Sequence, residues 1–165
     1  MQLRLDLDCL EALQLQAAQA RAALLEVFHT MPEAPYLASI PGLGGISAAT
    51  LLAEIGDPKN FTNASQLIKL AGTQPTPNRS GHKSRSLTPM SHKGRPNLRT
   101  ALFFASMRAI QSDDVLARRY TQVQERKQNP LCKMQALGVI MNRLLRIAWA
   151  VMRDHTMYNP AYLAA

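Results

Sequence analysis

Apolar residues recur at heptad spacing near the beginning of the chain. The first series is Leu3, Leu10, Ala17 and Leu24, and the second is Leu13, Ala20 and Val27. This pattern predicts a long amphipathic helix from near Leu3 to Phe28 that packs on another helix. The two prolines of the segment 31–35 end it, because proline removes a backbone donor and restricts the preceding residue.

Helical spacing and capping signals predict the rest of an all-α fold. A short helix should follow the prolines, and Asn63 with Gln66 has the form of a capping box for a helix that Gly72 stops. Apolar residues from Leu98 to Ala109 predict a helix with Pro96 in its first turn. The last third contains two more apolar stripes, over residues 113–128 and 134–152, with the methionines and Trp149 interpreted as core. The segment from Thr73 to Pro96 has no convincing periodicity of either kind, which predicts an irregular basic loop between two core helices. We expect a helical linker in 1–36, a central unit in 37–112 that contains this loop, and a C-terminal helical region in 113–165.

The segment from Ile40 to Leu52 resembles the helix-hairpin-helix motif. It has the order Ile-Pro-Gly-Leu-Gly-Gly, then a small Ala48 and paired leucines. Glycines would let a phosphate approach the amides at the start of the second helix, and Leu43 would fill the core. We therefore expect nucleic-acid contacts at Gly42, Gly44 and Gly45. The alternative is an ordinary helical turn that contains glycines.

The positive charge of the chain is concentrated between Pro58 and Ile110. This stretch has no Asp or Glu but carries nine cations: Lys59, Lys69, Arg79, Lys83, Arg85, Lys93, Arg95, Arg99 and Arg108. The rest of the chain has ten basic and eleven acidic residues, so the net charge of +8 is local. A concentrated positive field favours a polyanion such as DNA, because each neutralised phosphate releases counterions. A solvated basic surface is the alternative.

The remaining composition limits the class of protein. The only two cysteines, Cys9 and Cys132, each fall in an expected helix, which indicates reduced thiols and a cytoplasmic setting. The amino terminus lacks the basic and apolar regions of a signal peptide. The most apolar region, 131–152, contains Lys133, Arg143 and Arg146, so a membrane span is not expected.

Several short motifs together resemble one transposase family. The motifs are Ser39-Ile40-Pro41-Gly42-Leu43-Gly44, Leu70-Ala71-Gly72, Ser80-Gly81, Met90-Ser91-His92-Lys93-Gly94 and Leu98-Arg99-Thr100-Ala101-Leu102. In this order they resemble the C-terminal serine domain of the IS-one-ten insertion-sequence transposases, also called bridge-RNA-guided recombinases. The chain departs from that pattern at Ser86, where glycine is common, and at Thr73, where an aliphatic residue is usual.

The resemblance implies DNA transposition by serine-dependent strand cleavage and exchange, with Ser80 as nucleophile. Chemistry alone does not separate Ser80 from Ser84, Ser86 or Ser91; the resemblance favours Ser80. Forked guanidinium donors suit the charge that develops on a phosphate, so Arg79, Arg85 and Arg99 are the expected charge stabilisers. His82 could exchange a proton or contact a phosphate. Further nucleic-acid contacts are expected at Lys83, Ser91, Lys93 and Arg95, and Ser91 could instead cap the helix that carries Arg99.

The resemblance also implies components that this sequence does not show. Full-length family members begin with a RuvC-like domain whose carboxylates bind divalent metal, expected to be Mg²⁺, and we expect no metal site in this chain. The expected partners are DNA, guide RNA, the acidic RuvC-like domain and further copies in a synaptic complex, at the bacterial nucleoid. The chain would then be a truncated or split enzyme, incomplete alone. The alternatives are a non-catalytic helix-hairpin-helix binding module and an oligomerisation piece.

Overall fold

The computed structural model of this chain describes residues 2–76, 79–80, 83–84 and 89–161. It is mainly helical, as the apolar spacing predicted. The helices are α1 (Gln2–His29), α2 (Ala34–Ala38), α3 (Gly45–Ile55), α4 (Ala64–Ala71), α5 (Pro96–Ser112), α6 (Asp114–Glu125) and α7 (Lys133–Asp154), with a 3-10 turn η1 at Pro58–Asn60. Two short strands, β1 (Arg79–Ser80) and β2 (Lys83–Ser84), pair antiparallel.

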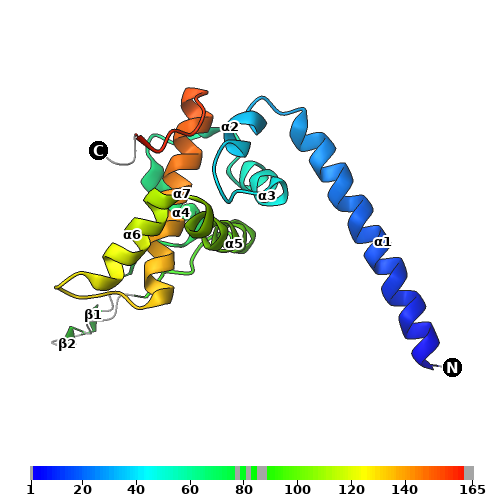
Figure 1. The fold of residues 1–165 in the computed structure, drawn as a ribbon, viewed down its shortest axis with the longest axis horizontal. Coiled ribbons are helices and arrows are strands. Elements are labelled where there is room, and N and C mark those ends of the chain that lie inside the picture. The colour runs from blue at the N-terminus through cyan, green and yellow to red at the C-terminus, as the bar shows by residue number, and fades with distance from the viewer. Residues whose placement is uncertain (1, 77–78, 81–82, 85–88, 162–165) are drawn as a thin grey trace.

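Helix α7 forms the centre of the core. It packs against α4, α5 and α6, and α5 in turn packs against α3 (Figure 1). Five of the six residues in its predicted apolar stripe are buried: Leu137, Met141, Leu144, Ala148 and Met152. Met134 was expected in the same stripe, but it is 63% exposed, because it is the second residue of α7 and burial begins two residues later at Ala136. Cys132, expected within a helix, is instead the exposed residue just before it.

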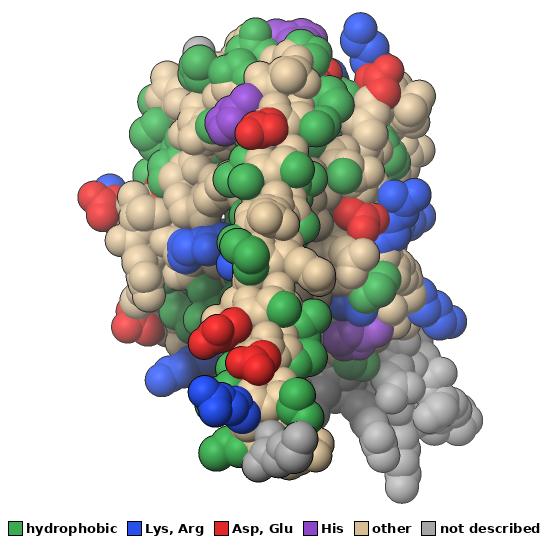
Figure 2. Space-filling model, turned by 90° about the vertical axis from the view of Figure 1, so that its right-hand side faces the viewer, with side chains coloured by type: hydrophobic (Ala, Val, Ile, Leu, Met, Phe, Trp, Pro, Cys, Tyr) green, Lys and Arg blue, Asp and Glu red, His purple; other side chains and the backbone are tan. Residues whose placement is uncertain are grey.

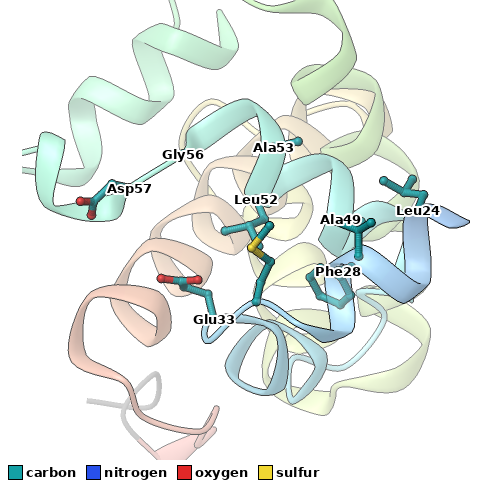
Figure 3. Close-up of a pocket in the computed structure, with 10 residues that line it drawn as sticks. Leu24, Phe28, Glu33, Ala49, Leu52, Ala53, Gly56 and Asp57 are labelled. Carbon is teal, nitrogen blue, oxygen red and sulfur yellow. The ribbon is translucent and has the colours of Figure 1, made fainter.

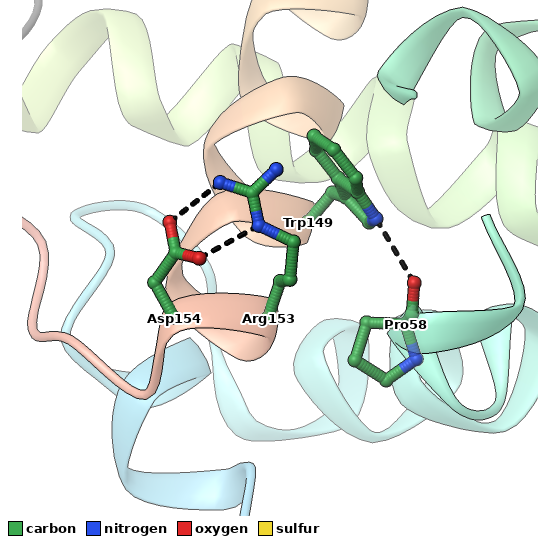
Figure 4. Close-up of polar contacts among 4 residues, drawn as sticks. All are labelled: Pro58, Trp149, Arg153 and Asp154. Carbon is green, nitrogen blue, oxygen red and sulfur yellow. Dashed lines mark hydrogen bonds and ion pairs between the residues drawn. The ribbon is translucent and has the colours of Figure 1, made fainter. Parts of the chain in front are cut away.

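Trp149 joins α7 to the turn that follows α3. Its indole Nε1 donates a hydrogen bond to the carbonyl oxygen of Pro58 at 3.1 Å (Figure 4). The Arg153 guanidinium lies 4.3 Å from the centre of the same ring and forms two bonds with Asp154, of 2.6 and 2.7 Å. The prediction that Trp149 belongs to the core is therefore confirmed, and Arg153 is already engaged by a ring and a carboxylate.

Helix α1 extends away from this core, and only its last turns reach α2 and α3 (Figure 1). Its predicted bounds are confirmed, but its predicted packing is wrong over most of its length. Phe28 is its one buried residue among those described, whereas Leu3 and Leu13 are 74% and 57% exposed. Figure 2 shows hydrophobic side chains along the outward face of this helix. Among the described residues the core takes only Phe28 from α1, so most of the heptad stripe is exposed.

An apolar cavity lies where α1 meets α3. It has a volume of about 450 Å³ and is lined mainly by Leu24, Phe28, Ala49 and Leu52, with carboxylates of Glu33 and Asp57 near its edge (Figure 3). Leu52, which was expected to bury against the first helix of the hairpin, is only half-buried and lines this cavity. The apolar surface of α1 therefore continues into a hollow of the core.

The segment after α7 returns to the middle of the chain. The backbone N–H of Tyr158 donates to the Ser39 hydroxyl at 2.8 Å, and its phenol donates to Oδ2 of Asp113 at 2.5 Å. The other oxygen of Asp113 accepts from the N–H of Leu116 and caps α6. Burial raises the pKa of the Tyr158 phenol above its ordinary value, and the bond to Asp113 raises this pKa further. Tyr158 therefore connects the segment after α7 with the end of α2 and with the start of α6.

Within the described residues, no helix is both long and apolar enough to cross a membrane.

Candidate nucleic-acid interface

The hairpin consists of α2, a tight turn and α3. The N–H of Leu43 donates to the carbonyl of Ile40 at 3.1 Å, and the side chains of both residues are buried. Gly44 is the residue before α3, and its carbonyl accepts the first helical bond from Ala48 at 2.9 Å. Because a helix leaves its first amides without intrahelical partners, the exposed amino end of α3 presents donors to an anion. The predicted burial of Leu43 is confirmed.

The three glycines of this turn have different surroundings. Gly42 has a φ of +79°, and a Cβ there would lie 2.3 Å from the backbone nitrogen of Ala109 in α5. A Cβ at Gly45 would lie 2.8 Å from a methyl of Leu25 in α1. At Gly44 the nearest group is the guanidinium of Arg108, at 3.8 Å. Close helix packing therefore explains Gly42, Gly45 contacts a leucine side chain that can move, and Gly44 faces a cation at the surface.

Arg108 links α5 to both ends of this turn. Its Nε donates to the carbonyl oxygen of Gly42 at 3.1 Å, and its Nη2 donates to the hydroxyl of Ser47 at 2.7 Å. The side chain is exposed, so its charge lies beside the exposed amino end of α3. Sequence reasoning counted Arg108 among the cations but did not assign it to the site. Only its place in the acid-free stretch could have suggested this role.

A second group of cations surrounds the start of α5. Nη1 of Arg99 donates to the carbonyl oxygens of Ala71 at 3.1 Å and His92 at 3.5 Å. Nη1 of Arg95 bonds to the carbonyl of Glu54 at 2.6 Å and lies 3.3 Å from its carboxylate. Lys69 and Lys93 are exposed beside them. Arg99 and Arg108 are nine residues apart on one helix, so the two cationic places are separated by roughly 14 Å along its axis.

A short backbone ladder joins the two ends of the segment expected to be irregular. Residues 72–76 pair with residues 89–92: the N–H of Thr76 donates to Pro89 at 2.8 Å, that of Ser91 to Gln74 at 2.9 Å, and that of His92 to Gly72 at 3.0 Å. These residues contain one isolated antiparallel bridge, between Pro75 and Met90, and neither side is a regular strand, so the irregular character of the segment is kept at its two ends. We call these residues the ladder.

Of the expected catalytic residues, Arg99 lies in α5, and the others come from the segment between the two sides of the ladder. Arg79 and Ser80 form β1, and Ser80 pairs with Lys83 in β2, but only the backbone of these residues is described. Arg85, His82 and Ser86 lie outside the described residues. Figure 1 shows β1 and β2 beyond the amino-terminal end of α7, on the opposite side of the molecule from α1.

Ser91 does not cap the helix that carries Arg99. Arg95 is the residue before α5, Pro96 begins the helix, and Ser91 lies in the ladder instead. The capping prediction is wrong because the ladder extends to His92 before the chain turns into α5. Among the residues that the structure describes, no three His, Cys, Asp or Glu side chains are grouped so that they could hold a metal ion.

A helical chain that places cations and a free helix terminus beside a basic segment has the features of a nucleic-acid-binding protein. The model of the IS116/IS110/IS902 transposase family matches residues 34–122. The chain belongs to this family, and that confirms the coarse form of the resemblance.

The chain is similar to several longer proteins along most of its own length. It is 31% identical to the 42 kDa protein of insertion element IS900 from Mycobacterium paratuberculosis, over 93% of this chain and 38% of that protein. It is 29% identical to the pilin gene-inverting protein of Moraxella lacunata, over 81% of this chain and 42% of that protein. It is 28% identical to the 43.6 kDa protein of insertion element IS110 from Streptomyces coelicolor, over 91% of this chain and 36% of that protein. The matched region thus spans well under half of these relatives.

Proposed function

We propose that this chain is the DNA-contacting and strand-cleaving part of a transposase, with Ser80 as the nucleophile. In this proposal the Ser80 hydroxyl oxygen attacks a DNA phosphorus, the bond to one deoxyribose oxygen breaks, and that oxygen takes up a proton. The phosphoserine ester conserves the bond energy for joining to another strand. Family membership and the order of the motifs support the proposal.

The observation that carries the DNA-contacting part is the exposed amino end of α3 beside Arg108. Backbone donors and a guanidinium are the groups that bind a phosphate, and helix-hairpin-helix motifs contact the DNA backbone in this way. Gly44, Lys93 and Arg95 remain proposed contacts, as do Gly42, Gly45, Lys83 and Ser91. The second cationic place, at the start of α5, would contact another phosphate.

The proposed cleavage chemistry assigns the arginines different parts. Arg79 and Arg85 remain the proposed stabilisers of charge on the phosphate. Arg99 donates to two backbone carbonyls, so any catalytic role for it would require the remaining guanidinium N–H groups. An acidic RuvC-like domain, in the same protein or in a partner, would supply carboxylates for Mg²⁺. Guide RNA and further copies of the chain complete the proposed assembly at the bacterial nucleoid.

The test of DNA contact is the salt dependence of binding. With about five phosphates contacted, affinity should fall by roughly a few hundredfold between about 50 and 200 mM salt. A flat salt response would contradict the proposal. The test of cleavage is a covalent adduct with nicked insertion-end DNA when the acidic domain and guide RNA are added, and an adduct that persists in Ser80→Ala would remove Ser80 from this role.

A non-catalytic binding module is the second candidate. It is favoured by the engagement of Arg99 and Arg95 with backbone carbonyls, which is a structural use of two expected functional cations. This candidate predicts the same salt dependence but no adduct under any of the conditions above.

A further inference from the structure

Thr73 connects the first side of the ladder to α7. It is 1% exposed, and its hydroxyl donates to Oδ1 of Asn142 at 2.5 Å. The amide nitrogen of Asn142 returns a hydrogen bond to the carbonyl oxygen of Thr73 at 3.3 Å. One side-chain amide therefore satisfies a buried hydroxyl and a backbone carbonyl, and losing it would leave both without this partner.

The second side of the ladder contacts α7 through Met90. A Cβ at Gly138 would lie 2.3 Å from the terminal methyl of Met90, so glycine at this position leaves room for that side chain. Because this methyl is the end of a flexible side chain, the contact shows where Met90 lies and not that glycine is required. Gly138 and Asn142 are four residues apart and share one face of α7. We call Thr73, Met90, Gly138 and Asn142 the loop seat.

The start of α5 and the residues before it also hold the ladder, at the end nearest α4. Arg99 bonds to the carbonyls of Ala71 and His92, one from each end of the segment. Gly94 approaches closely as well, since a Cβ there would lie 2.4 Å from the carbonyl oxygen of Leu70. The position of the ladder is therefore fixed against α4, α5 and α7 together.

We propose that the loop seat positions Ser80 for strand cleavage, with Asn142 as a positioning residue that touches neither DNA nor the reacting atoms. The inference rests on the proposed function of Ser80. Ser80 is four residues beyond Thr76, a span of at most about 14 Å, so the position of the ladder limits where the nucleophile can lie. A misplacement of about 1 Å can cost a hundredfold in rate.

The experiment compares Asn142→Leu, Thr73→Val and the double variant with the unchanged chain. Leucine keeps nearly the shape of asparagine but makes no hydrogen bond, and valine does the same for threonine. The matched control is Gln122→Ala, an exposed neutral residue on α6. The measurements are the single-turnover rate of adduct formation, with the acidic domain and guide RNA present, and the DNA affinity of the chain.

Asn142→Leu should lower the adduct rate by about tenfold or more while the Kd for DNA stays within about twofold. The double variant should recover part of the rate, because an apolar pair of the same shape is less costly than one unpaired polar partner. An unchanged rate, or a loss of affinity equal to the loss of rate, would overturn the inference.

A failure of the proposed function can be distinguished from a failure of this inference. If the unchanged chain forms no adduct, Ser80 is not the nucleophile under these conditions. Amide hydrogen exchange then tests, without any cleavage, whether the loop seat holds the ladder in place. In Asn142→Leu the amides of Thr76, Ser91 and His92 should exchange faster, while those of α5 should not. Equal exchange at the ladder amides would overturn the loop seat.

Discussion

Arg108 uses one guanidinium for two tasks. Its bonds to Gly42 and Ser47 fix the turn before α3, and its charge lies at the exposed end of that helix. A lysine would preserve the charge, but a single ammonium group is not a planar fork and does not reproduce both bonds in this geometry. Replacing Arg108 by lysine therefore tests the hydrogen-bond geometry of this side chain while its charge stays the same.

Arg108→Lys should weaken DNA binding by about threefold to tenfold without changing the net charge, since the turn loses a hydrogen bond to a charged donor. Arg118→Lys is the control, because Arg118 is an exposed arginine of α6 that bonds only within its own helix at Asp114. Binding measured at one salt concentration checks the difference. Equal affinities for the two variants would show that Arg108 contributes charge alone.

Tyr158 makes stability depend on pH at the alkaline end. Its pKa is raised in the folded chain, so the folded state keeps the phenolic proton at a pH where the unfolded state, with a pKa of about 10, loses it. The stabilisation is complete below that pH and is lost as the pH rises through the folded pKa. Thermal unfolding should therefore become easier above pH of about 10, and less so in Tyr158→Phe, which should itself cost about 1–3 kcal/mol at neutral pH by leaving Oδ2 of Asp113 without its phenol donor.

At the scale of single residues, the sequence predicts which residues matter better than it predicts their hydrogen-bond partners. The cations and glycines could be identified from composition and spacing, and the burial of Leu43 followed from the motif. The bonds of Arg108 to Gly42 and of Thr73 to Asn142 join residues 66 and 69 positions apart. Such pairs depend on how helices cross, and no local pattern specifies that.

At the scale of elements, the turn between α2 and α3 depends on contact with α5. Gly42 has a left-handed conformation and abuts the backbone of Ala109, whereas Gly44 is extended and a Cβ there would make only ordinary contact with the Arg108 guanidinium. Gly42→Ala should cost about 2–4 kcal/mol through strain and overpacking. Gly44→Ala should cost about 0.5–1 kcal/mol, because Gly44 is the N-cap of α3 and alanine is a poorer N-cap than glycine. Urea unfolding of both variants checks this, and equal costs would contradict the close approach of α5.

The helices themselves were predictable because their signals are local. Asn63 accepts a hydrogen bond from the N–H of Gln66, Gly72 is left-handed at the end of α4, and Pro96 begins α5, all as the caps indicated. The ladder was not predictable, because its two sides are few residues long and contain prolines. The exposure of α1 was not predictable either, since a heptad stripe shows that a helix needs a partner but not where the partner lies.

At the scale of the whole molecule, the described surface has two distinct regions. The cationic residues of α5 and of the segment just before it lie on the surface of the compact helical part, and the exposed leucines lie along α1 (Figures 1 and 2). Large exposed apolar surfaces mark places of association. DNA contact and assembly would then use separate parts of the chain, which allows each to be disrupted without the other.

The proposed homo-oligomer can be tested on α1 itself. Two antiparallel copies would place Leu10 opposite Ala20 and Leu13 opposite Ala17, filling each small position with a large one. A parallel pair would bring Asp6 against Asp6 at the seam, so the antiparallel arrangement is favoured. Leu13→Arg should raise the dimer Kd by about a hundredfold or more, because burying leucine contributes about 1.5–3 kcal/mol and each change counts twice.

Leu15→Arg is the matched control for this change. Leu15 is as exposed as Leu13, at 61% against 57%, but lies off the heptad stripe, so the same charge there should leave the dimer intact. Sedimentation over a range of concentrations measures both variants, and DNA affinity per chain should be unchanged in each. A monomer at every concentration of the unchanged chain would contradict self-association, and equal weakening by the two variants would contradict the antiparallel seam.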